Sequence, residues 1–557
     1  MRTLARNAVL TGCLVVAAQG WTATISMDEE IPTTVSSPTQ RITIDEFGRR
    51  WLEQANYDNV VYHYPKQLAH LYSLRDFSPI WQEADARQSL ENQLRVIALA
   101  DLSPWFSERL ALLEQAKSSA EWRHYDVLAT DTLIAYMRYQ ELARTQGRTW
   151  YFGAGADVDG LSPAIAEMDG LTQALSSHYF YSWLEGRKPL GSVYDEMQQS
   201  LDALIAIKQT HGHLPPFTVP NVLRPNDYLP QGEELVEILV TLGDLDPQVG
   251  EQIKASGVNR YSTELVQAVK RFQTRHGLGV DGVIGPATRG WLNISLDERV
   301  RLMALNMERL RVWNPQRSNM LVVNLPNFEL KLWQDDEMVF DSRVIVGRPS
   351  RRTPLLTSQL DTVVFNPPWN VPPTIMEEDI LPRVKADMNY LSRHNYQILK
   401  GWSSNEVIAP ESIDWSAVNV SRFPYRIQQA PGNSNALGRF KFNMPNSQAI
   451  YLHDTPSKGL FNRSHRALSS GCIRVERAAS LASLLMSQSG VSSRRVSTYR
   501  SSLDTKFVRI RGQVPVELVY QTAWVEDGQR QYRNDIYSYD QPHAGPFDRE
   551  RLTALGY

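Results

Sequence analysis

The chain has 557 residues, of which 42% are hydrophobic and 21% are charged, and its formal net charge is −3. A chain of this length is too long for a typical domain with a single hydrophobic core, so we expect two to four domains. The charge gives no global basic field of the kind that nucleic-acid binding uses, and the eleven histidines are scattered without metal-ligand spacing. We therefore expect no nucleic-acid partner, no metal and no cofactor.

The N-terminus reads MRTLARNAVLTGCLVVAAQG, with two arginines, an apolar run and small residues near its end. This pattern predicts a signal peptide over residues 1–20 and export of the chain. Two alternatives stay open. The run could be an uncleaved anchor, although it is shorter than the roughly 18–20 residues of a membrane span, or LTGC could be lipidated at Cys13. Residues 21–44 are rich in Ser, Thr and Pro and are predicted to be a linker.

Residues 45–215 show helical periodicity. Val193, Met197, Leu201 and Leu204 recur at the spacing of one helix face, and the run ends at HGHLPP. Such stripes are typical of a packed core. The segment is predicted to be a helical domain without chemistry of its own.

Residues 216–295 contain FQTRHGLGVDGVIGPATRGWLN, a helix followed by a turn and a short helix. This pattern resembles the small three-helix peptidoglycan-binding repeat, whose Phe-Gln, Asp-Gly, Ile-Gly and Thr positions are all present. Gly282 and Gly285 could equally serve only to build the turns, and a similar fold does not by itself prove binding.

After a helical connector near 296–313 the period of the apolar residues changes to two. Phe328, Leu330 and Leu332 alternate with polar residues, which predicts an antiparallel meander. We expect a mainly-β domain over residues 316–505 with one helix packed behind its cysteine. Residues 506–557 are predicted to add C-terminal strands, with a hairpin turn at the Asp-Gly pair of VEDGQ.

Cys472 is the one cysteine that remains if the N-terminal segment is removed. A lone thiol in an exported chain is either a small buried hydrophobe or a reactive group. A nucleophilic cysteine needs a favoured thiolate, a base and an oxyanion site. We expect a helix that begins near Val475 to favour the thiolate, the Gly471 amide to help hold an oxyanion, and His453, at the end of a strand, to serve as the base.

The same stretch resembles the signature of the L,D-transpeptidases, whose catalytic domain is called YkuD-type. That signature is a histidine, a loop, Ser or Thr, any residue, Gly, Cys, an aliphatic residue and then Asn or Arg, and residues 453–474 fill it. FNPPWNVPPTI (365–375) and APGNSNALGRFKF (430–442) are similar to two further family stretches. Many family members have a second histidine two residues before the cysteine, where this chain has Ser470, so that histidine is not carried over.

With the binding repeat and the helical region, the resemblance covers most of the chain and extends to the large YcbB-like class of Gram-negative bacteria. It implies a multidomain α+β fold with a helical scaffold domain, a small three-helix peptidoglycan-binding-like domain and a mainly-β YkuD-type catalytic domain. Residues 374–430 exceed the family minimum and read as helix then strand. We expect them to be a capping insertion that excludes water from the site.

The implied reaction is acyl transfer between peptidoglycan stem peptides in the periplasm. Cys472 would attack the diaminopimelate carbonyl of a tetrapeptide stem and release D-alanine, leaving a thioester. The side-chain amine of a second stem would resolve the thioester into a 3→3 cross-link, with His453 moving the protons. Cell-wall synthesis proteins or carboxypeptidases are further possible partners, and acylation of Cys472 by carbapenems is expected.

The resemblance also implies roles for other residues. Asp454, or its backbone carbonyl, would orient His453, although it could simply begin the Asp-Thr-Pro turn. The amides of Gly471 and Cys472 are the candidate oxyanion donors. Arg474 would hold a substrate carboxylate or brace its loop. The remaining candidates for substrate binding are Tyr451, Ser470, Trp369 and Asn435, of which Tyr451 and Trp369 could instead be core.

Two other functions stay open at this point. The first is a cell-wall cysteine hydrolase, such as an L,D-carboxypeptidase. Cell-wall cysteine peptidases place the cysteine before the histidine, whereas here His453 comes first, but the transpeptidase family itself can hydrolyse. The second is a non-catalytic peptidoglycan-binding scaffold, which would have no need of a lone thiol.

Overall fold

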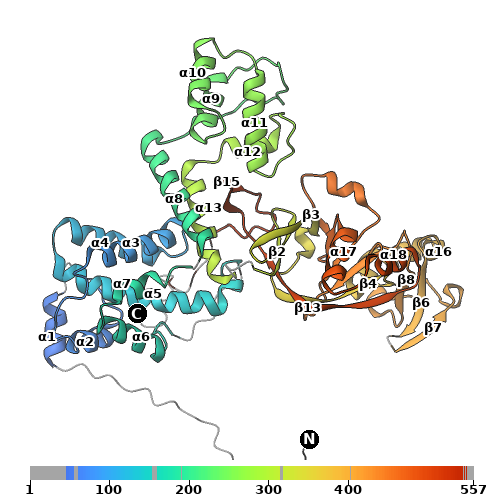
Figure 1. The fold of residues 1–557 in the computed structure, drawn as a ribbon, viewed down its shortest axis with the longest axis horizontal. Helices are drawn as coiled ribbons and strands as arrows, with labels where there is room; N and C mark the ends of the chain where they lie inside the picture. The colour runs from blue at the N-terminus through green and yellow to red at the C-terminus, as the bar shows by residue number, and fades with distance from the viewer. Residues whose placement is uncertain are drawn as a thin grey trace, which may run out of the picture.

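The computed structural model describes residues 46–55, 60–153, 160–189, 191–313, 318–401, 403–542, 545 and 547. The predicted signal peptide, the linker and Cys13 therefore lie outside the described residues. Three bodies are visible in Figure 1: a helical body at the lower left, a smaller helical domain at the top, and a β-rich domain at the right. Within the described ranges, no helix combines the length and the apolar character that crossing a membrane requires.

The N-terminal body is helical, as predicted. Its helices are α1 (Glu46–Ala55), α2 (Pro65–Ser73), α3 (Ala84–Leu99), α4 (Pro104–Ser118), α5 (Trp122–Trp150), α6 (Ile165–Leu175), α7 (Phe180–Glu185) and α8 (Ser192–His211). The predicted apolar face of α8 is buried at Met197, Leu201 and Leu204. Helix α4 begins with a proline, and the Ser103 hydroxyl caps it by accepting from the Phe106 amide.

Helix α13 (Leu296–Arg309) returns to this body after the next domain and packs against α8 and α3. It is followed by a 3-10 turn, Leu310–Val312. Helix α13 is buried along most of its length, as expected of a helix in the middle of a bundle. The segment predicted as a connector near 296–313 is therefore part of the helical body, and residues 216–295 are inserted between α8 and α13.

The inserted domain consists of α9 (Gly232–Thr241), α10 (Pro247–Ala255), α11 (Thr263–Arg275) and α12 (Pro286–Leu292), one helix more than the three that the resemblance implied. The Gln273 side chain bridges its turn, because it donates to Asp281 and to the Val283 carbonyl and accepts from the Gly282 amide. Gly282 has φ +73°, which favours glycine. These contacts give the motif residues a structural role, and ligand binding here stays a prediction.

The C-terminal domain contains a nine-stranded sheet in the order β11-β3-β12-β10-β9-β4-β13-β1-β2. Its strands are β1 (Leu321–Asn324), β2 (Glu329–Gln334), β3 (Glu337–Gly347), β4 (Thr357–Phe365), β9 (Phe440–Asn443), β10 (Leu452–His453), β11 (Ala467–Ser469), β12 (Ile473–Val475) and β13 (Lys506–Val519). The predicted meander is confirmed, since β2 pairs antiparallel with both β1 and β3. Helices α17 (Ala478–Gln488) and α18 (Ser493–Ser501) follow β12.

Strand β13 corrects the predicted boundary at residue 505. It lies inside the sheet, parallel to β1 on one side and antiparallel to β4 on the other, so a boundary at 505 would remove an interior strand. The predicted hairpin after it is confirmed. Strands β14 (Ala523–Glu526) and β15 (Gln529–Tyr532) flank Asp527 and Gly528, both with positive φ, as in a type I′ turn.

Residues 369–429 contain a second, smaller sheet in the order β5-β8-β6-β7. Its strands are β5 (Trp369–Asn370), β6 (Tyr396–Gly401), β7 (Ser404–Ile408) and β8 (Arg426–Gln429), and its helices are α14 (Pro373–Ile375), η3 (Met376–Ile380), α15 (Leu381–Ala386) and α16 (Asn389–Arg393). The unit has a core of its own: Val371, Ile380, Leu381, Val384, Leu391, Ile398 and Ile427. The predicted order of helix then strand is confirmed, and Figure 1 shows the unit at the far end of the β-rich domain.

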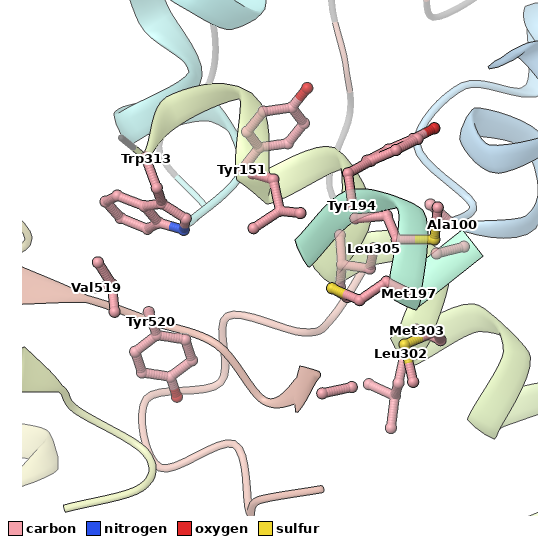
Figure 2. Packing of buried hydrophobic residues seen from close by; sticks show 14 of the residues in the cluster. Ala100, Tyr151, Tyr194, Met197, Leu302, Met303, Leu305, Trp313, Val519 and Tyr520 are labelled. Carbon is pink, nitrogen blue, oxygen red and sulfur yellow. The ribbon is translucent and has the colours of Figure 1, made fainter. Parts of the chain in front are cut away.

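The helical body and the large sheet meet in a continuous buried cluster (Figure 2). Tyr151, at the end of α5, and Met197 of α8 lie near α13, and Trp313, Val519 and Tyr520 belong to the same cluster. Val519 is the last residue of β13. Strand β13, an interior strand of the sheet, therefore ends in the buried cluster that the sheet shares with the helical body.

Candidate active site

Three neighbouring strands place five polar or reactive side chains on one face of the sheet. β10 lies between β9 and β12, and His453 is paired with Lys441 on one side and with Arg474 on the other. Side chains alternate along a strand, so Tyr451 shares a face with His453, and Cys472 shares a face with Arg474. The rings of Tyr451 and His453 have their centroids 5.7 Å apart.

Cys472 precedes strand β12, and this overturns one expectation from the sequence. Helix α17 begins only at Ala478, so no helix N-terminus near Val475 favours a thiolate. The side chain of Cys472 is partly buried, with Sγ 3.9 Å from the Ala449 carbonyl oxygen. Burial raises the pKa of the thiol, and Tyr451 partly offsets this through hydrogen bonds from its amide and side chain. The thiol is therefore protonated near neutral pH and needs a base.

The His453 side chain is buried, and its Nδ1 lies 2.5 Å from the Asp454 backbone oxygen. Because a carbonyl only accepts, Nδ1 carries the proton and Nε2 keeps its lone pair. Burial, together with the Arg474 and Lys441 charges, lowers the pKa of His453 to about 3. The imidazole is therefore neutral in the physiological range and able to accept a proton.

Of the two alternatives for Asp454, the structure places the backbone carbonyl against His453. The carboxylate points elsewhere: it accepts from the Arg439 amide at 2.9 Å and pairs with Lys458. Gly438 has φ +59°, and a Cβ at that position would lie 2.4 Å from the Asp454 carboxylate. The carboxylate thus holds the turn beside the site, while the carbonyl of the same residue contacts the histidine.

The loop before Cys472 is held by its own hydrogen bonds. The Ser469 hydroxyl donates to the Cys472 carbonyl at 2.6 Å and accepts from the Gly471 amide at 3.1 Å. Thr353 donates to the Gly471 carbonyl at 2.7 Å. The Gly471 amide, predicted to bind an oxyanion, is therefore engaged within the loop. Glycine is favoured at position 471 by its backbone φ of +114°. Crowding is not the reason, since a Cβ at this position would meet nothing closer than 3.5 Å.

Ser470, where many relatives have histidine, connects the loop to the smaller sheet unit. Its hydroxyl accepts from Arg351 at 2.9 Å. The same guanidinium pairs with Asp379 at 2.6 Å and with Glu378, both in η3. The sequence did not indicate Arg351, because the contact depends on two loops that lie far apart in the chain.

Two cations near the sulfur have no carboxylate partner among the described residues. The Nε of Arg474 is buried without a hydrogen-bond partner. Lys441, which the sequence analysis missed, has its Nζ 4.3 Å from the centre of the Tyr451 ring. Burial lowers the pKa of the Lys441 ammonium and of the Arg474 guanidinium. The nearby Cys472 sulfur acts in the opposite direction and raises both pKa values. Both cations are therefore available to an anion that enters the site.

The structure brings Trp369 to the site and keeps Asn435 away from it. Trp369, in β5, is partly exposed and hydrogen-bonds to the Tyr451 side chain. Asn435 is fully buried. Its amide nitrogen donates to the carbonyl oxygen of Ala430 at 2.9 Å, and its side-chain oxygen accepts from the Leu437 amide at 2.8 Å. The predicted substrate contact by Asn435 is therefore wrong, since this side chain is occupied in shaping its loop.

Comparison with known proteins finds three family matches along the chain. Residues 66–201 match the "Scaffold domain" family, residues 233–292 the family described as "Putative peptidoglycan binding domain", and residues 318–498 the "L,D-transpeptidase catalytic domain" family, YkuD. The predicted fold class is confirmed in its three parts.

A curated relative from Haemophilus influenzae, named "Putative L,D-transpeptidase", is 35% identical over 476 residues, which are 85% of this chain and 78% of the relative. The chain belongs to the L,D-transpeptidase family. A solved structure of an L,D-transpeptidase from Stackebrandtia nassauensis is 13% identical and aligns over 55% of this chain and 97% of its own, with a TM-score of 0.19. That score is too low to support any argument about this site.

Proposed function

We propose that the protein forms 3→3 cross-links in peptidoglycan, with Cys472 as the nucleophile and His453 as the general base. The observation that carries this proposal is the shared strand face on which a protonated thiol and a neutral, oriented imidazole lie beside unpaired cations. A structural cysteine would need neither the oriented histidine nor the cations. The pair starts neutral, so activation is a proton transfer and not a resting ion pair.

In the first half-reaction the thiol proton moves from Sγ to Nε2 of His453. The sulfur attacks the diaminopimelate carbonyl carbon of a tetrapeptide stem, and the Cys472 amide donates to the oxyanion. The C–N bond to D-alanine then breaks. His453 returns the proton to the leaving amine, D-alanine departs, and a thioester remains.

In the second half-reaction His453 is again neutral and takes a proton from the side-chain amine of an acceptor stem. The amine nitrogen attacks the thioester carbon, the C–S bond breaks, and the sulfur recovers its proton from His453. The product is an amide between two diaminopimelate residues. Water in place of the amine would give hydrolysis, so the choice between transfer and hydrolysis depends on which nucleophile reaches the thioester.

The two unpaired cations have separate roles in this proposal. Arg474 presents a planar fork of donors, which suits a stem-peptide carboxylate, and its buried Nε is the donor left unmatched. Lys441 is a point charge beside the sulfur and stabilises the Cys472 thiolate. That thiolate attacks the carbonyl in the first half-reaction and is the leaving group in the second. Each cation thus stabilises a negative charge that appears only with substrate or during the reaction.

The smaller sheet unit acts in this proposal as a cap that limits water. Trp369 reaches Tyr451 from β5, and Arg351 connects Ser470 to Asp379. One link ends at Ser470, two residues before the nucleophile, and the other at Tyr451, which hydrogen-bonds to Cys472. Excluding water from a thioester favours aminolysis. Deleting residues 376–425 in a chain that still folds is expected to raise the ratio of hydrolysis to transfer, and an unchanged ratio would contradict the role of the cap.

The family matches associate the protein with the cell wall, and we place it in the periplasm. This placement depends on the signal peptide predicted for residues 1–20, which is outside the described part of the chain. Mass spectrometry of the N-terminus of the exported protein tests it. A free N-terminus near residue 21 supports cleavage. Lipidated Cys13 or an intact leader would replace the signal-peptide assignment.

Intact-protein mass spectrometry with a tetrapeptide donor and no acceptor tests the proposed chemistry. We expect one adduct per chain, with the mass of the donor less D-alanine, and no adduct in Cys472→Ala. Adding an acceptor stem should discharge the adduct into a 3→3 dimer, identified by fragmentation. If discharge gives only tripeptide, the protein is a carboxypeptidase. If folded protein with a free thiol forms no adduct, Cys472 is not the nucleophile.

A further inference from the structure

The face of the large sheet that holds Cys472 and His453 continues over three further strands, in the order β12-β10-β9-β4-β13. Residues that pair across neighbouring strands point to the same face. His453 pairs with Lys441, and Lys441 pairs with Val364. Val364 pairs in turn with Phe507 of β13. The row of side chains that begins at His453 therefore ends at Phe507, a residue that none of the roles assigned above uses.

A second row, the Cys472 row, runs beside the first. Continuing the strand register by one residue brings Tyr451 between Cys472 and Asn443. Asn443 pairs with Thr362, and Thr362 pairs with Arg509. The row crosses five strands, so it spans about 19 Å from Cys472 to Arg509 at the usual spacing between strands.

The Cys472 row is open to solvent along its whole length. Its first four residues are partly exposed, and Arg509 is exposed. The side chains of Asn443 and Thr362 form no hydrogen bond with the described part of the chain, and Arg509 forms no ion pair there. Phe507, two residues before Arg509 and on the same face, is 70% exposed. The row thus offers two unbonded polar side chains and ends at an unpaired cation beside an exposed aromatic ring.

The position of His453 decides which substrate lies over this row. In the proposed reaction the leaving amine and the attacking amine exchange protons with the same Nε2 atom, so both nitrogens lie on the His453 side of the sulfur. From β10, which carries His453, the sheet continues through β9 to β4 and β13, which lie side by side in Figure 1. The acyl part of the donor lies on the other side of the sulfur, towards β12 and β3. The stem that leads away over β9, β4 and β13 is therefore the acceptor.

We propose that the Cys472 row binds the acceptor stem, with Arg509 as the partner of its glutamate carboxylate. The glutamate of a stem is joined to diaminopimelate through its side chain, so its α-carboxylate stays free. At ordinary bond lengths the extended chain from the reacting amine to that carboxylate spans roughly 13 Å. The long side chain of Arg509 covers the remaining distance, and its planar donors suit a carboxylate. The assignment rests on the proposed function, because the acceptor side is defined by the roles of Cys472 and His453.

The other residues of the two rows have parts that follow from their chemistry. Asn443 and Thr362 lie between the ends of the Cys472 row and present hydrogen-bonding side chains to the peptide groups of the stem. Phe507 covers apolar atoms of the stem beside Arg509 and loses its contact with water. An amine without a carboxylate at this distance gains nothing from Arg509. Holding the acidic acceptor over the thioester raises the effective concentration of its amine and favours transfer over hydrolysis.

The first test separates the two half-reactions on full-length mature protein. The acyl-enzyme is formed with a tetrapeptide donor and then mixed with a tripeptide stem, which has no D-alanine to release and serves only as acceptor. Intact-protein mass spectrometry follows the discharge. In Arg509→Gln the acceptor concentration for half-maximal discharge should rise about tenfold, with a smaller salt dependence. Phe507→Ala should raise it about threefold. D-alanine release from the donor should keep the parent rate in both variants.

Two protein controls and one acceptor control accompany this test. Lys506→Gln removes an exposed cation from the neighbouring position of β13, whose side chain points to the opposite face. Tyr179→Ala removes a 72% exposed ring of the helical body. Both variants should behave like the parent. A tripeptide stem amidated at the glutamate α-carboxylate should discharge the parent as poorly as the unmodified stem discharges Arg509→Gln, and Arg509→Gln should not distinguish the two stems.

A second measurement needs no catalysis. Calorimetric titration of the Cys472→Ala protein with the tripeptide stem should give about tenfold weaker binding when Arg509→Gln is added, and unchanged binding when Lys506→Gln is added. If no thioester forms in the first test, the proposed reaction fails, and this titration still decides whether the row binds a stem.

Three results would overturn the proposal. The first is the same acceptor dependence in the parent, Arg509→Gln and Lys506→Gln, together with equal affinities in the titration. The second is a loss that falls on D-alanine release and spares discharge, which would assign the row to the donor. The third is equal discharge of the parent by the amidated and unmodified stems, which would remove the carboxylate from the site.

Discussion

Buried cations have carboxylate partners at the junction between the helical body and the large sheet, but not at the catalytic face. At the junction Arg309 pairs with Asp540 at 2.6 Å, and Arg311 pairs with Glu308 at 2.7 Å. At the catalytic face Arg474 and Lys441 are largely buried without any carboxylate among the described residues. Leaving a buried charge unpaired costs free energy. At the junction the carboxylate partners indicate a structural role for the cations, whereas at the catalytic face we propose that a ligand or a reacting group supplies the missing charge.

This difference predicts opposite outcomes for mutations in the two regions. Removing a charge at the junction should destabilise the fold and leave the chemistry of folded molecules intact. Removing a charge or a base at the catalytic face should leave the fold intact, or stabilise it, and impair the chemistry. Each prediction below compares stability with activity in the same variant.

The largest expected effect is on the base. His453→Gln should lower the rate of thioester formation about 10²- to 10⁴-fold, because the thiol loses its proton acceptor. The measurement is D-alanine release, with thermal unfolding as the check on fold.

In the parent, the pKa of about 3 for His453 keeps the base unprotonated as the pH falls. Activity should therefore stay level from about pH 7 to pH 5, where a histidine with the usual pKa of about 6.5 would become protonated. A loss of activity centred near pH 6.5 would contradict the buried, neutral imidazole.

At the junction, Asp540→Asn should reduce the free energy of unfolding by about 3–5 kcal/mol, because it leaves Arg309 buried and unpaired. Arg309 also donates to the Tyr539 carbonyl at 2.6 Å, so the guanidinium cannot easily turn to solvent. Chemical denaturation measures the change, and turnover per folded molecule should be unaffected. The exposed pair Lys400–Glu406 supplies a control, since Glu406→Gln should change stability by less than about 1 kcal/mol. Equal effects of the two substitutions would remove the contrast between the regions.

Arg474→Gln should reverse this pattern. Substrate binding loses a carboxylate partner, so KM should rise about tenfold or more while the free energy of unfolding is unchanged or higher. The salt dependence of KM should also become smaller. If Arg474 only braces its loop, the variant will instead be less stable, and KM in the molecules that remain folded will be normal.

Most of the site could be predicted from the sequence, because the residues of the motif are close together in the chain or lie across from one another on paired strands. It placed Cys472, His453 and Arg474 on what the structure shows to be one face. It placed the start of a helix near Val475, although the β-branched Ile473 and Val475 favour a strand, and helix α17 begins only at Ala478. Strand β13 and helix α13 were predicted as a strand and a helix, but each was separated from the domain in which it packs. Their partners lie far away in the chain, and periodicity says nothing about such partners.

Lys441 shows the same limit at the level of one residue. It lies in RFKF, where alternation predicts only that the lysine and its aromatic neighbours point to opposite faces. That it stands across from His453 depends on the register between β9 and β10, which sequence alone does not supply. Asn435 is the converse case, because its motif position suggested substrate contact while its amide is bonded inside the loop.

Lys441→Met gives the smallest expected effect and the finest test of the unmatched cations. The Lys441 charge lowers the pKa of the Cys472 thiol against the larger opposing effect of burial, so its removal should raise that pKa further. Alkylation by iodoacetamide follows the thiolate fraction, and at about pH 8, below the pKa, it should slow several-fold. Above both pKa values the rates of parent and variant should converge. Lys441→Arg keeps the charge and should behave like the parent, whereas equal slowing in Met and Arg variants would mean that the lysine acts through packing against Tyr451 and not through its charge.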